Sequence, residues 1–155
     1  MAMNYPEPQL DDLYRDLILD HYRHPRNRGE LENASAKVDG YNPLCGDEVE
    51  VELRFDDDTI EDVAFKGRGC SISQASTSMM TDAIKGRSRD EAREMIAAFK
   101  RMMTEPEEEP PELLGDLEAF QGVAKFPVRV KCATLAWNVL EQGLAKADAS
   151  DGETN

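Results

Sequence analysis

The chain has 155 residues, with 18 Lys plus Arg against 32 Asp plus Glu, so its formal net charge is −14. This length fits one domain (residues 1–155), and 40% hydrophobic residues are enough to form a core. The acidity argues against binding to nucleic acid or to an anionic membrane, because phosphate groups would be repelled. No apolar run approaches the roughly 20 residues that span a bilayer, and Met1–Asp20 lacks the basic and apolar regions of a secretory signal. We therefore expect a cytoplasmic protein without a membrane segment.

An amphipathic helix is the first element that the sequence predicts. Apolar residues recur at helical spacing from Leu10 to Tyr22, and Pro25 ends the pattern. His21 and His24 lie three residues apart at the end of this helix, a spacing that would allow both to bind one metal ion. Histidines in this position are more often surface residues, so we expect both imidazoles to face solvent.

Three strands are expected next, at residues 36–42, 48–55 and 59–66. In the second strand, apolar and charged residues alternate without interruption, as they do in a strand that is buried on one face only. Asp56-Asp57-Asp58 forms the turn between the second and third strands. Ile60 and Val63 are out of phase in the third strand, so we expect a β-bulge there.

Helices are expected in the rest of the chain. The first has Ser71 or Ser73 as its N-cap, and a capping box at residues 88–91 begins the second. The Met-rich apolar stripe of this second helix is expected to belong to the core. A short helix near residues 113–120 and a long helix from Pro127 complete the chain.

Two polar segments interrupt this pattern. Residues 104–112 include the acidic, proline-rich sequence EPEEEPPE, which predicts a solvated loop, and residues 148–155 are expected to form a polar tail. The strands are grouped ahead of most of the helices. This order indicates an α+β fold, in which a small three-stranded antiparallel sheet packs against helices.

Three cysteines, Cys45, Cys70 and Cys132, stand at the boundaries of predicted elements. An odd number of cysteines cannot form a complete set of disulfides, and a cytoplasmic chain would not keep them. Cys70 and Cys132 lie near helix N-termini, where the helix dipole and free N–H groups stabilise a thiolate. The residues alone leave two interpretations open: three unrelated buried cysteines, or one shared metal site.

Asp47 is the candidate fourth ligand of a shared site, because it follows Cys45 by two residues. Three thiolates and one carboxylate suit tetrahedral Zn²⁺, in which soft sulfur ligands predominate. These four ligands leave an excess of negative charge around the ion. Arg68, Arg129 and Lys131, which lie beside the ligands in the sequence, are expected to offset that charge.

Four segments resemble the IscU/NifU-type iron–sulfur cluster assembly family. They are residues 13–29, Asn42–Asp47 (NPLCGD), Phe65–Ser73 (FKGRGCSIS) and Val130–Trp137 (VKCATLAW), and they span most of the chain in order. The resemblance implies the sheet-and-helix fold of this family. It also implies that a metal ion or cluster is bound by Cys45, Asp47, Cys70 and Cys132.

Three departures from the IscU scaffolds indicate the SufU subgroup of this family. Scaffolds have a histidine just before the third cysteine, where this chain has Lys131. They also have a Leu-Pro-Pro-Val-Lys segment, where this chain has Phe126–Lys131, and they lack the insertion around Arg87–Glu112. Members of the subgroup are similar to scaffolds, but they bind zinc and accept sulfur from a SufS-type cysteine desulfurase.

The resemblance therefore implies a zinc-dependent sulfurtransferase of iron–sulfur cluster biogenesis, which passes sulfur on to a downstream SUF scaffold. Cys45 is expected to be the catalytic sulfur acceptor, because the adjacent Gly46 allows its loop to move. Two alternatives remain open. One is a scaffold that assembles a [2Fe–2S] cluster, or holds iron, on the same ligands. The other is a structural zinc domain that only binds a partner.

Overall fold

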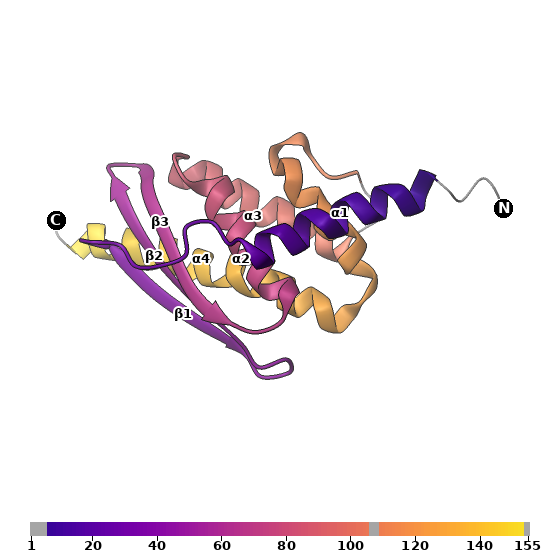
Figure 1. Ribbon diagram of the computed structural model, residues 1–155. Coiled ribbons are helices and arrows are strands. Elements are labelled where there is room, and N and C mark those ends of the chain that lie inside the picture. Colours follow the sequence, from indigo (N-terminus) through magenta and orange to yellow (C-terminus); the bar gives the residue numbers. More distant parts are fainter. Residues whose placement is uncertain (1–5, 106–108, 154–155) are drawn as a thin grey trace.

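The computed structural model describes residues 6–105 and 109–153. Its elements are, in order, α1 (Pro6–Arg23), β1 (Ala36–Asn42), β2 (Asp47–Asp56), β3 (Thr59–Arg68), α2 (Ser71–Ile84), α3 (Arg89–Thr104), the 3₁₀ helix η2 (Glu112–Lys125) and α4 (Pro127–Glu153). The predicted α+β fold is confirmed, because an antiparallel sheet in the order β1-β2-β3 packs against helices (Figure 1). Within the described residues, no helix has the length and hydrophobicity needed to cross a bilayer.

The inner face of the sheet packs closely on α4. Val49, Val51 and Leu53 of β2 alternate toward this face and are almost completely buried. Gly40 of β1 lies directly against α4, since a Cβ atom at this position would be 2.6 Å from a methyl carbon of Val139. The lack of a side chain at Gly40 therefore sets how closely the sheet approaches the helix.

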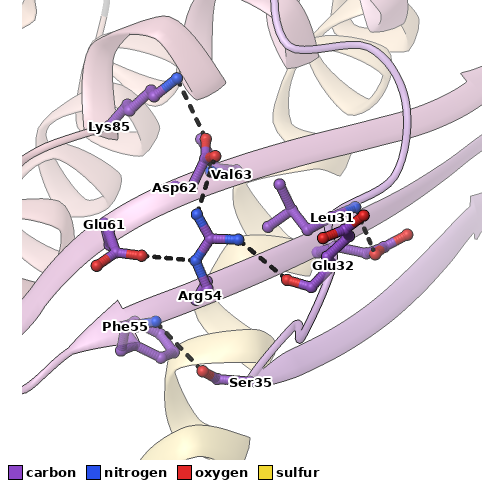
Figure 2. Close-up of polar contacts among 10 residues, drawn as sticks. Leu31, Glu32, Ser35, Arg54, Phe55, Glu61, Asp62, Val63 and Lys85 are labelled. Atoms are coloured by element: carbon purple, nitrogen blue, oxygen red, sulfur yellow. Dashed lines mark hydrogen bonds and ion pairs between the residues drawn. The ribbon is translucent and has the colours of Figure 1, made fainter.

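A β-bulge in β3 brings two acidic side chains to one arginine on the outer face of the sheet (Figure 2). The pairing with β2 shifts between Arg54 and Phe55 and skips Glu61, which confirms the predicted bulge. In a regular strand, Glu61 and Asp62 would point to opposite faces. Here both carboxylates reach the Arg54 guanidinium, at 2.6 Å and 3.3 Å.

The same arginine fastens the segment between α1 and β1 to the sheet. Arg54 donates a hydrogen bond to the Glu32 carbonyl at 3.0 Å (Figure 2). The Glu52 carboxylate accepts one from the Leu31 N–H at 3.1 Å. The alternation of β2 places Glu52 on the outer face, but its side chain is buried. The segment that follows α1 therefore covers part of the outer face.

Helix α2 begins without a side-chain cap. The prediction of Ser71 or Ser73 as N-cap is wrong, because the N-cap is Cys70, whose side chain makes no capping hydrogen bond. The helix starts directly after the loop that leaves β3, and the Ser73 hydroxyl instead donates to the Cys70 carbonyl at 3.2 Å. At α3 the predicted capping box is confirmed, with Ser88 and Glu91 bonded reciprocally.

Helices α2, α3 and α4 meet at Trp137. Its indole ring stacks on Phe99 of α3 with 4.6 Å between ring centroids, and its N–H donates to Ser76 Oγ of α2 at 3.2 Å. The methionines of α3 that were expected in the core, Met95 and Met103, are buried, and Met102 is buried as well. The segment between the second and third cysteines thus contributes a complete helix to the core.

The C-terminal part of the chain is more helical than predicted. The 3₁₀ helix η2 extends beyond the short helix expected at residues 113–120. Helix α4 continues through most of the segment 148–155 that was predicted to be a polar tail, and Asp148 forms a 2.9 Å ion pair with Arg89 of α3. Of the predicted acidic loop, residues 106–108 lie outside the described part of the chain.

One of the two histidines is buried, contrary to the prediction. His24 is exposed as expected, whereas His21 is 6% exposed and shares a 2.8 Å hydrogen bond with Ser78 Oγ of α2. The prediction for His21 was wrong because the last turn of α1 packs on α2, a contact that the periodicity of α1 does not reveal. Burial, and then the charge of Arg26, lower the pKa of His21 below 6.5.

Buried His21 should make the protein less stable in mild acid. Because its pKa is lower in the folded state, the unfolded chain takes up this proton first as the pH falls below about 6.5. The free energy of unfolding should therefore decrease between about pH 7.5 and 5.5, and His21→Gln should reduce this decrease. Urea unfolding at several pH values measures it, with His24→Gln as the matched control. An equal pH dependence in wild type and His21→Gln would contradict this assignment.

Candidate metal centre

The four predicted ligands come from three parts of the fold and lie at the same end of the sheet (Figure 1). Cys45 is in the turn between β1 and β2, and Asp47 is the first residue of β2. Cys70 lies between β3 and α2, and Cys132 is in the second turn of α4. Asp47 and Cys132 are fully buried, whereas Cys45 and Cys70 are partly exposed.

Three of the four side chains are close enough to share one ion. Cys45, Asp47 and Cys132 each place a ligand atom within 4.8 Å of the other two, and the two sulfurs are 3.0 Å apart. Cys70 is not in this group of three, but its Sγ lies 3.8 Å from Asp47 Oδ2. All three cysteines are free thiols.

Asp47 connects the start of β2 to the start of α2. Its Oδ1 accepts a hydrogen bond from the Cys70 N–H at 2.8 Å, while Oδ2 faces the Cys70 sulfur. Gly69 makes this contact possible, because its φ is 148° and a Cβ atom there would overlap Asp47 Oδ1. One carboxylate oxygen thus orients Cys70, and the other remains available to bind a metal ion.

Burial gives the Cys132 thiol a raised pKa. Loss of hydration raises the pKa of Cys132, and its hydrogen bonds with Cys45 and Asp47 raise it further. The Cys132 sulfur also lies 3.7 Å from the Val128 carbonyl. A thiol in this environment keeps its proton unless a cation compensates the thiolate charge, as a bound metal ion does.

Asn42 is a site residue that the sequence reasoning did not single out. It is buried at the end of β1, and its Nδ2 lies 3.7 Å from Cys132 Sγ. Its Oδ1 accepts a hydrogen bond from the Leu44 N–H at 3.2 Å, so one amide connects the cysteine turn with α4. The available signal was its position, since Asn42 is a polar residue on the inward-facing side of the strand that enters the turn.

Arg129 is the predicted cation that the structure places beside the thiols. Cys70 first, and then Cys132, raise the pKa of the Arg129 guanidinium, which lies in the first turn of α4. Arg68 instead pairs with Glu48 at 3.2 Å. Lys131 lies on the exposed side of α4. Of the three cations that were expected to offset the negative charge, the structure thus places Arg129 beside the thiols.

Large apolar side chains are exposed around the cysteines. Leu44, next to Cys45, is 62% exposed, and Phe126 and Val128 at the start of α4 are 60% and 56% exposed. Exposed apolar groups beside a reactive group are common where a protein partner docks. The cysteine cluster thus opens on a face that is suited to a protein contact.

The donor set fits zinc. Three sulfurs and one carboxylate oxygen are ligands that Zn²⁺ accepts, and at ordinary bond lengths the corners of its tetrahedron are about 3.6–3.8 Å apart. The 3.8 Å between Cys70 Sγ and Asp47 Oδ2 agrees with this spacing. The 3.0 Å between the sulfurs of Cys45 and Cys132 is shorter, and a small rotation of the partly exposed Cys45 side chain is enough to lengthen it.

Known proteins are similar in sequence to this chain over most of its length. The chain is 51% identical over 142 residues to the zinc-dependent sulfurtransferase SufU of Bacillus subtilis (strain 168), covering 92% of this chain and 96% of that protein. It is 44% identical over 139 residues to the iron–sulfur cluster assembly scaffold protein IscU of Streptococcus pyogenes serotype M1, covering 90% and 87%.

Solved structures share the fold as well. A candidate iron–sulfur cluster assembly scaffold for the SUF system from Fervidobacterium islandicum AW-1 superposes with a TM-score of 0.78 at 42% identity, covering 83% of this chain and 93% of that one. The N-terminal part of a NifU-like protein from Brucella abortus gives 0.82 at 26% identity, covering 90% and 97%. The model of the NifU-like N terminal domain matches residues 13–150. The chain therefore belongs to the NifU-like N terminal domain family.

Proposed function

We propose that this protein is a zinc-dependent sulfurtransferase of iron–sulfur cluster biogenesis, which accepts persulfide sulfur from a SufS-type cysteine desulfurase. The observation that carries the proposal is the contrast within the cysteine cluster. Asp47 and Cys132 are fully buried, whereas Cys45 lies on a partly exposed turn. Cys70 is also partly exposed, but its N–H is held by Asp47 at the start of α2, so Cys45 is the accessible thiol on a turn. A site with buried ligands and an accessible thiol on a turn suits transfer better than a purely structural role. The similarity to the SufU of Bacillus subtilis supports the proposal.

Cys45, Asp47, Cys70 and Cys132 would hold the zinc ion. Bound zinc lowers the pKa of cysteine thiols and so keeps them deprotonated at neutral pH. Cys70 is held through its N–H by Asp47, and Cys132 is fixed by the packing of α4. Arg129, whose guanidinium lies beside Cys70 and Cys132, places a positive charge next to both sulfurs.

Cys45 is the proposed sulfur acceptor. Its thiolate attacks the terminal sulfur of the donor persulfide, so that an S–S bond forms at Cys45 while the S–S bond of the donor breaks. The donor cysteine leaves as a thiolate, and the exchange needs no further oxidant or reductant. Cys45 then carries the persulfide, which a downstream SUF scaffold in the cytoplasm would receive.

Lys131 favours transfer over cluster assembly on the same ligands. It occupies the position just before the third cysteine, where scaffolds of the IscU type have a histidine. A protonated lysine has no free electron pair and cannot take the place of an imidazole ligand. The similarity to the IscU of Streptococcus pyogenes keeps the scaffold as the second candidate.

Protein purified without added iron should contain about one zinc ion per chain, because the site offers one tetrahedral donor set. Elemental analysis by mass spectrometry measures the metal content, and the rate of cysteine desulfuration with and without this protein measures the function. Strong stimulation of the desulfurase is expected. An iron–sulfur absorption band after anaerobic reconstitution, together with little stimulation, would support the scaffold instead.

Replacement of Asp47 by alanine should weaken zinc binding about 10- to 100-fold, since it removes a ligand and leaves the Cys70 N–H without its acceptor. Competition with a chromophoric chelator measures the zinc affinity. Asp39→Ala is the matched control, because Asp39 is an exposed aspartate on β1. Equal zinc affinity in the two variants would remove Asp47 from the ligand set.

Cys45→Ala and Cys45→His should both abolish sulfur acceptance, because neither has a nucleophilic thiol at this position. Cys45→His keeps a side chain that can bind zinc, so its metal content should stay close to that of the wild type. Mass spectrometry of the protein after incubation with desulfurase and cysteine detects the added sulfur atom. Sulfur acceptance by Cys45→His at the wild-type rate would show that zinc is structural and that Cys45 is not the acceptor.

A further inference from the structure

A groove with a cavity volume of about 500 Å³ lies between α1, α2 and η2. Its lining includes Ile18 and Leu19 of α1, Ile72 of α2 and Val123 of η2. Its lining also includes Ser71, the residue that follows Cys70, and Phe126, the residue that precedes α4. The volume is within the range of about 300–1,000 Å³ that is common for binding pockets. The groove is therefore large enough for a short segment of another chain.

The charged residues that line this groove are both basic. Arg15 of α1 and Lys125 of η2 lie at its rim, and both are exposed. Their positive charge contrasts with the net charge of −14 of the whole chain. Since most of the surface repels an acidic segment, such a segment would be attracted to this rim.

A larger hollow on the outer face of the sheet does not have such a preference for an acidic partner. Its cavity volume is about 970 Å³, and charges of both signs line it. Lys66 pairs there with Glu50 at 3.5 Å, and Arg68 pairs with Glu48 at 3.2 Å. Because these charges compensate one another, the outer hollow does not favour a partner of either sign.

We propose that the groove between α1, α2 and η2 binds the segment of the sulfur donor that carries its persulfide cysteine, a segment with apolar residues and at least one Asp or Glu. This proposal rests on the function proposed above. The donor sulfur must reach the cysteine cluster. Because Ser71 of the groove lining directly follows Cys70, a donor segment with its cysteine at the cluster can continue along the groove. Ile18, Ile72 and Val123 would contact its apolar side chains, and Arg15 and Lys125 would pair with its carboxylates.

Gly122 allows the groove to be filled without disturbing the fold. It lines the groove, and a Cβ atom built on it meets no atom within 4 Å. Gly122→Leu should therefore occupy the space meant for the donor segment. Lys125→Glu reverses one of the two rim charges. Lys146→Glu is the matched control, because Lys146 is an exposed lysine of α4 that is 14 residues, or about 21 Å, from Cys132.

Sulfur transfer to each zinc-loaded variant is measured with two donors, the cysteine desulfurase with cysteine and the small molecule glutathione persulfide. With the desulfurase as donor, KM is measured for this protein as the sulfur acceptor. Gly122→Leu and Lys125→Glu should raise this KM about tenfold and change kcat less than about twofold. The KM of Lys125→Glu should also depend less on salt than that of the wild type. Lys146→Glu should behave like the wild type. All variants should accept sulfur from glutathione persulfide equally, because this donor does not need the groove.

Four other results would contradict one of the two proposals. An unchanged KM in both groove variants would overturn the groove and leave the proposed function intact. Equal losses with both donors would show that the groove supports the structure of the site and does not dock the donor. A wild-type dimer that Gly122→Leu dissociates, seen by light scattering, would assign the groove to a second copy of the chain. Failure of the wild type to take sulfur from either donor would overturn the proposed function itself.

Discussion

The hydrogen bond from the Cys70 N–H to Asp47 Oδ1 is the contact on which the site depends. It joins the first residue of β2 to the N-cap of α2, and thereby fixes the sheet and the helix relative to each other. Asp47 is fully buried, and a buried carboxylate without partners is strongly unfavourable in an apolar environment. The Cys70 N–H meets part of this requirement, and Gly69 provides the space for it. A cation bound to the second oxygen would meet the rest, and metal binding at this side chain would then be coupled to folding.

The order of elements and most of their boundaries could be predicted because they follow from local patterns. The alternation in β2, the bulge in β3 and the capping box at Ser88 are each set by residues a few positions apart. The errors arose where a distant segment decides the outcome. His21 is buried by α2, and Asn42 acquires its role only when Cys132 of α4 lies beside it. Cys70 begins its helix without a side-chain cap, and its N–H is bonded to a residue 23 positions earlier.

In the cysteine cluster, too, the local sequence alone was not enough to predict the outcome. The spacing of the cysteines left unrelated core residues and a shared site equally open, and only the resemblance to a family joined them. The fold brings Cys45, Asp47 and Cys132 within 4.8 Å of one another and places Cys70 next to Asp47. Exposure differs within the cluster, because a turn, a strand, a helix start and a long helix each contribute one residue. Which thiol is accessible is therefore a property of the element that carries it.

Trp137 is the single tryptophan of the chain, and it lies on α4 five residues after Cys132. At a rise of about 1.5 Å per residue, the indole is roughly two helical turns or less from the cysteine cluster. It stacks on Phe99 of α3, and its N–H is bonded to Ser76. A displacement of α4 on loading or unloading of the site would change both contacts. The protein thus has one intrinsic fluorophore in its core, and its emission would report such a displacement without any added label.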